Sequence, residues 1–263
     1  MRYPSELAIM LYIMLYSNEK QVLCQEQPSG RPPSRPGGTH GYEQMNTERY
    51  RTLYLGGSGE ITEKKSRFIA TLLPVKTEEE ALVFIEQIKK KYWDAKHNCS
   101  AYVIGRDGGL TRCSDDGEPP HTAGRPMLDV LLAEGIRDAA VVVTRYFGGV
   151  LLGTGGLVRA YQAAVKEGLA RCTVIEKQFG RRLVIRTDYS GVGKLQYIAA
   201  QEGVAILSSE YADTVTVTLF VSPHEEELLT RRLTEATAGR AVITPGEASW
   251  YSIRDGELLL FGD

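Results

Sequence analysis

Apolar residues recur along this chain at two spacings, and each spacing predicts a different kind of element. Strand-forming segments cover residues 60–75, interrupted by a basic cluster at 64–67, and then residues 98–106, 110–114 and 139–144. Thr77 and Glu80 form a capping box that opens a helix, whose buried face is expected at helical spacing on Ala81, Ile85, Ile88 and Tyr92. Further helices are expected at residues 127–134 and from about Gly156. The first part of the chain therefore predicts a mixed α+β domain.

A second pattern begins after Gly180. Residues 182–187 read as a strand, 192–202 as a helix, and 204–211 and 214–221 as two strands joined by a tight turn. Ser222, Pro223 and Glu225 supply the N-cap, the first helical residue and the capping partner of another helix, before a last strand around 241–244. The order β-α-β-β-α-β is that of a ferredoxin-like fold. We predict an α+β protein with domains at 46–178 and 180–263, meeting between about 174 and 182 and sharing no sheet.

Residues 1–45 differ from the rest of the chain. Their apolar run, Leu7 to Tyr16, is shorter than the roughly 20 residues that a helix needs to cross a bilayer. Arg2 precedes it, as in a signal peptide, but no small-residue cleavage site follows, and residues 27–41 have the composition of a disordered linker. We interpret 1–45 as a disordered extension, or as sequence upstream of a true start at Met45. A signal or anchor and a packed extra segment are the alternatives.

Composition and charge narrow the classes of partner. The 263 residues are 43% hydrophobic, enough for two cores, and the net charge of −2 excludes a global field that attracts nucleic acid or anionic membranes. A polyanion would need a local patch, and residues 46–179, with 19 Lys and Arg against 17 Asp and Glu, favour one more than residues 180–263, with 8 against 12. The four cysteines are scattered without a Cys-x-x-Cys pair, which favours reduced thiols in a cytosol.

A glycine-rich loop offers the first candidate site. It follows a strand that ends in Arg145, and it leads into a helix near Gly156. Free N–H groups at a helix N-terminus can bind an anion where glycines allow close approach. The loop is neither a P-loop nor a dinucleotide fingerprint, since Val158 occupies the last glycine position. The alternative is that the glycines serve only tight turning and packing. The glycines concerned are Gly148, Gly149, Gly153, Gly155 and Gly156.

An acidic loop, residues 115–126, offers the second candidate site. Asp115, Asp116, Glu118 and His121 could act as acid and base, or the carboxylates could hold Mg²⁺. The prolines of the loop, however, favour a rigid exposed segment whose carboxylates keep ordinary pKa values, and aspartates are common turn residues. We therefore expect no metal and no cofactor, and the four residues remain weak catalytic candidates.

The same two loops carry a resemblance to a known family. Residues 65–68 (KSRF), 114–128 (SDDGEPPHTAGRPML), 144–149 (TRYFGG) and 153–161 (GTGGLVRAY) are similar to the ordered motifs of the YigZ/IMPACT family, over about residues 60–170. The tail from about 180 resembles the small C-terminal domain of bacterial members. One departure is His121, which stands where the family usually has glycine.

The resemblance implies a first domain like the βαβ domain four of elongation factor G and a ferredoxin-like second domain like its domain five. It also implies a link to translation, because eukaryotic relatives regulate translation by binding a ribosome-associated activator of a stress kinase. They do so with an additional domain not recognised in this sequence, so that route does not transfer directly. Function argued from a fold remains an analogy.

We therefore expect a cytosolic, translation-associated binding or regulatory protein that contacts RNA or a ribosome-associated protein, with no membrane contact by the folded body. The expected anion-binding patch combines the glycine loop with Lys64, Lys65, Arg67, Arg125, Arg145 and Arg159. An enzyme acting on a small phosphorylated or carboxylated substrate and a purely protein-binding regulator are the alternatives. We expect both loops to converge, with Arg145 directed at the acidic loop or at solvent that the two loops share, and we expect Arg145 to matter more for binding than Lys90.

Overall fold

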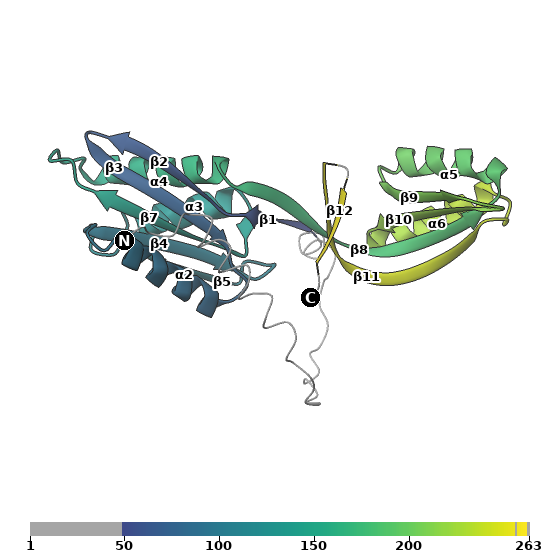
Figure 1. Cartoon of the computed structure of the whole chain (residues 1–263), viewed down its shortest axis with the longest axis horizontal. Coiled ribbons are helices and arrows are strands. Elements are labelled where there is room, and N and C mark those ends of the chain that lie inside the picture. Colours follow the sequence, from purple (N-terminus) through teal and green to yellow (C-terminus); the bar gives the residue numbers. More distant parts are fainter. Residues whose placement is uncertain (1–48, 256, 262–263) are drawn as a thin grey trace, which may run out of the picture. The chain divides into compact units, whose positions relative to one another are not determined.

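The computed structural model describes residues 49–255 and 257–261, so the expectations for residues 1–45 and Met45 lie outside the described residues. The described chain is a mixed α+β structure with two sheets (Figure 1). None of its helices is both long enough and apolar enough to cross a membrane. In chain order the elements are β1 (Arg49–Leu55), β2 (Gly57–Glu63), β3 (Ser66–Pro74), α2 (Glu78–Lys91), β4 (His97–Ile104), β5 (Leu110–Ser114), α3 (Gly124–Ala133), β6 (Ile136–Arg137), β7 (Ala139–Tyr146), α4 (Thr154–Ala170), β8 (Thr173–Thr187), α5 (Tyr189–Gln201), β9 (Ile206–Tyr211), β10 (Val215–Val221), α6 (Pro223–Ala236), β11 (Val242–Arg254) and β12 (Glu257–Phe261).

The first domain is built on a five-stranded antiparallel sheet ordered β2-β3-β7-β4-β5, with α2, α3 and α4 packed against it. Successive residues of β7 point to opposite faces. Val141 and Val143 join the core formed with α3 and α4, and the intervening Val142 is also fully buried, on the face covered by α2 (Figure 1). Burial on both faces explains why this strand reads as an unbroken apolar run.

The second domain has the predicted order β8-α5-β9-β10-α6-β11. Its strands form an antiparallel sheet in the spatial order β9-β10-β8-β11, which is the ferredoxin-like arrangement. Alternate residues of β10, from Val215 to Val221, face the helices, and they share a core with Leu195 of α5 and Leu229 of α6. The domain therefore has a hydrophobic core separate from that of the first domain.

The prediction that the domains share no sheet is wrong. Strand β8 runs without a break through the expected boundary at 174–182: its first part pairs with β1, and its later part pairs with β10 and β11. Gly180 lies within this strand and permits close packing, because a Cβ there would lie 2.7 Å from the Tyr251 ring and 2.8 Å from the Val221 carbonyl oxygen. The exact limits of the two domains, 46–178 and 180–263, remain a prediction.

Local sequence rules explain several element ends. The Thr77 side chain accepts a hydrogen bond from the Glu80 amide at 3.2 Å, and Ser222 forms the expected capping box that opens α6. The basic cluster is a hairpin turn, in which Lys64 and Lys65 have φ angles of 45° and 64°. Strands β1 and β12 were not expected, and β11 continues well past residue 244 because an irregularity between Pro245 and Ala248 absorbs its proline and glycine.

Candidate functional site

The two candidate loops meet at one end of the first-domain sheet. Strands β5 and β7 both run antiparallel to β4, so they point the same way and the loops that follow them leave the same end. Arg145, at the end of β7, donates from Nη1 to Oε1 of Glu118 in the acidic loop at 2.6 Å. The prediction that the loops converge and that Arg145 is directed at the acidic loop is confirmed.

A buried network centres on the Glu118 carboxylate. Its Oε1 accepts from Arg145 and also from the Tyr161 hydroxyl of α4 at 2.9 Å, and both ion-pair side chains are almost fully buried. The Cys99 sulfur lies 3.3 Å from the Tyr161 oxygen, and burial raises the pKa of both groups, so neither is a reactive nucleophile at neutral pH. Glu118 therefore joins the acidic loop to β7 and α4.

The Arg145 guanidinium is also enclosed by aromatic rings. Its central carbon lies 5.4 Å from the ring centroid of Phe68 and 5.7 Å from that of Phe147. Both contacts are in the range of cation–π attraction. The side chain is thus held by a carboxylate and two rings, which leaves little of it to meet an external phosphate.

Asp115 organises the acidic loop and starts the next helix. Its carboxylate accepts hydrogen bonds from three backbone amides: His121 at 2.8 Å, Ala123 at 3.0 Å and Gly124 at 2.8 Å. Partial burial disfavours the charged form, but the three backbone N–H groups outweigh it, so the pKa of Asp115 lies below its ordinary value. Asp115 caps α3 from a distance, which explains why that helix begins at Gly124 rather than at residue 127.

The rest of the loop is fixed by its neighbours. Asp116 accepts from the Asn98 amide at 2.7 Å and pairs with Lys89 at 3.3 Å, while Nδ1 of His97 lies 2.9 Å from the Asp116 carbonyl oxygen. His121 is exposed and has a φ of 63°, a left-handed conformation that glycine adopts without strain. A histidine at position 121, where the family usually has glycine, therefore holds the backbone in a conformation that is less favourable for its side chain than for glycine.

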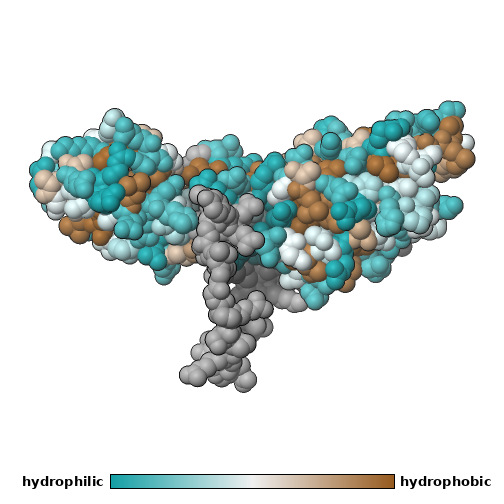
Figure 2. Space-filling model, turned by 180° about the vertical axis from the view of Figure 1, so that it is seen from behind, coloured by the Kyte–Doolittle hydropathy of each residue, from teal (hydrophilic) through white to brown (hydrophobic). Residues whose placement is uncertain are grey.

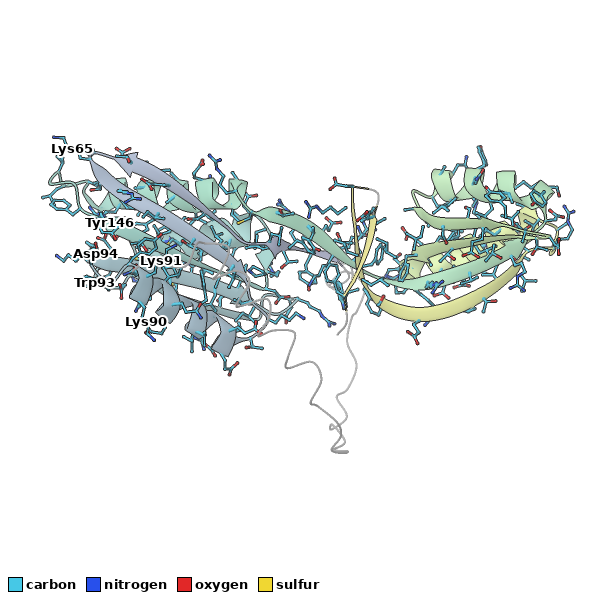
Figure 3. All side chains as sticks on the ribbon, in the orientation of Figure 1. Lys65, Lys90, Lys91, Trp93, Asp94 and Tyr146 are labelled. Carbon is cyan, nitrogen blue, oxygen red and sulfur yellow. The ribbon has the colours of Figure 1, made fainter. Side chains whose placement is uncertain are left out.

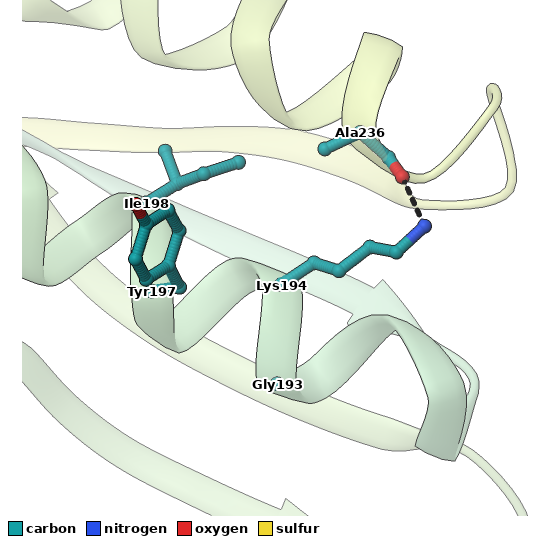
Figure 4. A pocket seen from close by; sticks show the side chains of 5 residues that line it. All are labelled: Gly193, Lys194, Tyr197, Ile198 and Ala236. Carbon is teal, nitrogen blue, oxygen red and sulfur yellow. Dashed lines mark hydrogen bonds between the residues drawn. The ribbon is translucent and has the colours of Figure 1, made fainter.

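The carboxylates of the acidic loop are all engaged in hydrogen bonds or ion pairs inside the domain, and their weak candidacy as catalytic groups stays a prediction. Each of the three is bonded within the loop or to the strands and helices that support it. The expectation that they sit exposed is wrong for Glu118, which is buried, and the expectation of an ordinary pKa is wrong for Asp115. Among the described residues, no group of three or more His, Cys, Asp or Glu side chains could hold a metal ion. Two open hollows, of about 350 and 450 Å³, lie on the second domain; the first, beside Tyr197, is drawn in Figure 4.

The cationic candidates divide into engaged and exposed groups. Arg145 is 6% exposed and is paired with Glu118, which argues against its predicted role as the leading phosphate contact, ahead of Lys90; that role stays a prediction. Arg67 is exposed but bonded to both carboxylate oxygens of Glu60, and Arg125 pairs with Asp129. The remaining candidates are exposed, and the described part of the chain provides no ion pair for any of them: Lys64, Lys65 and Arg159.

The glycines of the β7–α4 loop differ in what they do. A Cβ on Gly148 would lie 2.0 Å from the Lys65 carbonyl carbon and oxygen, so this glycine is required by packing against the lysine hairpin. Gly149 and Gly153 have φ angles of 83° and 73° with open space around them, and Gly156 packs against Leu152. Gly155 lies in the first turn of α4, close to the Arg159 side chain. The anion nest stays a prediction.

Two exposed apolar features were not recognised from the sequence. Between its glycines the β7–α4 loop carries Phe147, Val150 and Leu151, of which Leu151 is 82% exposed. Figure 2 shows apolar surface at the end of the first domain where this loop lies. Trp93 is also exposed, directly after the lysines that end α2. The sequence could have indicated their exposure, because none of these side chains belongs to the periodic buried face of a predicted helix or strand.

Comparisons with known proteins agree with the resemblance carried by the loop motifs. A model of the Impact N-terminal domain matches residues 64–169, and a model of a domain of unknown function, DUF1949, matches residues 185–240. IMPACT family member YvyE of Bacillus subtilis is 42% identical over 76% of this chain and 93% of its own length. IMPACT family member YigZ of Escherichia coli is 39% identical over 56% of this chain and 74% of its own length.

A solved structure described as the two-domain translational regulator Yih1 is also similar. It is 23% identical and covers 59% of this chain and 58% of its own, with a TM-score of 0.32. A likeness at that level supports no functional argument.

Proposed function

This chain belongs to the IMPACT family, and from that premise we propose that it is a translation-associated binding protein that contacts RNA or a ribosomal factor through its first domain. The link to translation rests on the family resemblance carried by the two loops. The first domain is favoured as the contact region because it holds that signature and because its charge balance is more positive than that of the second domain.

One structural observation carries the proposal: the groups that could perform catalysis are bonded internally, while cations and apolar groups beside them are exposed. Glu118 and Asp115 hold the loop together, whereas Lys64 and Lys65 project from the neighbouring hairpin. Gly148 packs that hairpin against the β7–α4 loop, so lysines and exposed apolar side chains lie on adjoining segments. Such a surface can contact phosphates without a large net charge on the protein.

The two alternatives are supported to different degrees. An enzyme would require its carboxylates to face a shared concave pocket, and the bonds made by Asp115, Asp116 and Glu118 argue against that use. A purely protein-binding regulator is supported by the exposed Phe147 and Leu151, because apolar surface of this kind is typical of protein interfaces. We also propose a cytosolic location, which is supported by the described cysteines, since Cys99, Cys113 and Cys172 are free thiols.

Sedimentation with ribosomal fractions tests the proposal. The full chain is incubated with ribosomes at about 50 and about 200 mM salt, a range over which phosphate contacts lose much of their affinity, and the bound fraction is measured. We expect binding at low salt that weakens at high salt, and a clear loss in the double variant Lys64→Ala and Lys65→Ala. Lys166→Ala is the control, because Lys166 is an exposed lysine of α4. Failure of the unmodified chain to bind ribosomes or their RNA at low salt would contradict the proposal.

A further inference from the structure

The tryptophan that follows α2 is exposed without an evident structural use. Trp93 is 79% exposed, whereas Trp250 is 4% exposed and packs against Tyr50 and Phe179. An aromatic side chain of this size contributes to folding mainly through the apolar area it buries. The exposed ring therefore contributes little to folding, and a planar apolar surface remains available to a ligand.

The turn that carries Trp93 is held to the end of the first domain that bears the candidate loops. The adjacent Asp94 accepts a hydrogen bond from the Tyr146 hydroxyl at 2.8 Å, and Tyr146 is the last residue of β7. Burial and this hydrogen bond raise the pKa of Tyr146 to about 12, so its hydroxyl stays protonated and keeps donating. Figure 3 shows Trp93, Asp94 and Tyr146 at one end of the domain, with Lys65 at the same end.

Exposed lysines flank the indole. Lys90 precedes it and Lys96 follows it, both are exposed, and no ion pair is found for either within the described ranges. Lys90 and Lys91 are labelled beside Trp93 in Figure 3. Attraction to the C-terminal end of α2 accounts for lysines at that position, but it does not account for an exposed indole beside them. The neighbouring carboxylate, Asp94, accepts a hydrogen bond from the Tyr146 hydroxyl.

We infer that Trp93 is a stacking platform for an unpaired base of single-stranded RNA, with Lys90 contacting a neighbouring phosphate and Lys65, at the same end of the domain, contacting a phosphate further along the strand. The inference rests on the proposed function and names the ligand and the surface. Alternation of an exposed aromatic ring with cations is how single strands are bound without sequence preference, because every base has a face that can stack. A duplex offers no such face along its length, since its bases already stack on one another.

Charge favours RNA over a protein partner at this surface. The core of a protein interface is depleted in charged residues, yet the sequence neighbours of Trp93 include Lys90, Lys91, Asp94 and Lys96. The other exposed apolar side chains of the domain include those of the β7–α4 loop and, nearer the start of α2, Leu82 and Val83, which lie ahead of the lysines that end this helix. A partner that needs both a flat apolar contact and positive charge matches a nucleotide base and its phosphates.

Intrinsic fluorescence tests this inference directly, because the chain has two tryptophans and Trp250 is buried. The full chain is titrated with a single-stranded oligouridine of about 12 nucleotides, a length within the site sizes of single-strand binders. We expect quenching of the Trp93 emission. By fluorescence anisotropy of a labelled oligouridine, Trp93→Leu should bind about tenfold more weakly, the scale expected for one lost base stack. Trp93→Phe, which keeps a ring, should remain within about threefold of the unmodified chain.

Matched controls separate stacking and charge from general effects of substitution. Tyr197→Ala removes an exposed aromatic residue of the second domain and should leave RNA binding unchanged. Lys90→Ala should reduce the slope of log affinity against log salt by about 0.7, the value for one phosphate contact with a single strand, whereas Lys166→Ala should not change it. A helical RNA duplex of the same length should give weaker quenching than oligouridine.

Each remaining outcome has a defined meaning. If oligouridine binds Trp93→Leu as tightly as the unmodified chain, the platform is refuted while the proposed function can stand on its ribosome binding. If Trp93→Leu loses ribosomes but retains RNA, this surface contacts protein and the inference is overturned. If the unmodified chain binds neither ribosomes nor RNA, the proposed function fails first and the inference fails with it.

Discussion

Replacing Glu118 tests whether the acidic loop is a structural junction. In Glu118→Ala the Arg145 guanidinium would remain buried without its carboxylate, and the Tyr161 hydroxyl would lose its acceptor. Removal of one partner from a buried ion pair typically costs about 3–5 kcal/mol, because it leaves an uncompensated buried charge. We expect a loss in the free energy of unfolding near the middle of that range, which is a large share of the roughly 5–15 kcal/mol that stabilises a typical domain.

Two further variants separate charge from shape. Glu118→Gln keeps an oxygen that can accept from Arg145 and Tyr161, so its loss should be smaller, about 1.5–3 kcal/mol. The double variant Glu118→Leu and Arg145→Met removes both charges from the same buried site and should recover most of the loss, because apolar pairs of similar volume often replace buried ion pairs without penalty. The control is Glu226→Gln, which removes a partly exposed ion pair with Arg181 in the second domain and should cost less than about 1 kcal/mol.

The assay is urea denaturation followed by circular dichroism, with hydrogen exchange of β7 and α4 peptides to locate the loss. Two separate cores can unfold in two steps, so localisation is needed before a single free energy is assigned. A loss below about 1 kcal/mol for Glu118→Ala would refute the structural reading. So would a loss of ligand binding in Glu118→Gln without any change in stability, since that result would return Glu118 to a functional role.

Three further changes follow from the same loops, each checked by denaturation. Gly148→Ala should destabilise by at least about 2 kcal/mol, because its Cβ would overlap the Lys65 backbone, whereas Gly193→Ala, with open space around it in α5, should be neutral or stabilising. His121→Gly should stabilise by about 0.5–1 kcal/mol, by relieving a left-handed φ. The folded pKa of Asp115 is lowered, so its contribution is present above the unfolded pKa and is lost as pH falls through the folded pKa; Asp115→Asn should flatten the loss of stability below about pH 4.

Much of the architecture follows from local signals in the sequence. Thr77 and Ser222 identify the starts of two helices because their side chains satisfy backbone groups of the first turn. The ferredoxin-like order follows from clean alternation in β10 and helical spacing in α5 and α6. The domain boundary was predicted wrongly at Gly180, because a glycine that permits close packing within a strand cannot be distinguished in the sequence from a glycine that ends a strand.

The position of the candidate site could be predicted from the sequence, but the burial of its charged side chains could not. Both loops follow parallel-running strands, so their convergence and the approach of Arg145 to the acidic loop could be foreseen. The burial of Arg145 and Glu118 could not be foreseen, because it depends on Tyr161 and Phe68, which reach the site from distant parts of the chain. The exposure of Trp93 could not be predicted for the same reason. It depends on where the turn after α2 lies against β7, which no local sequence pattern indicates.

Ultraviolet crosslinking of the full chain to ribosomes, followed by mass spectrometry of the RNA-linked peptides, tests the central claim most directly. Exposed aromatic and basic side chains in stacking contact with RNA are the groups expected to form adducts. We expect adducts on the peptides that contain Lys64, Lys65 and Trp93, and we expect their yield to decline as salt rises. Adducts confined to the second domain, or none above a non-binding control protein at low salt, would contradict it.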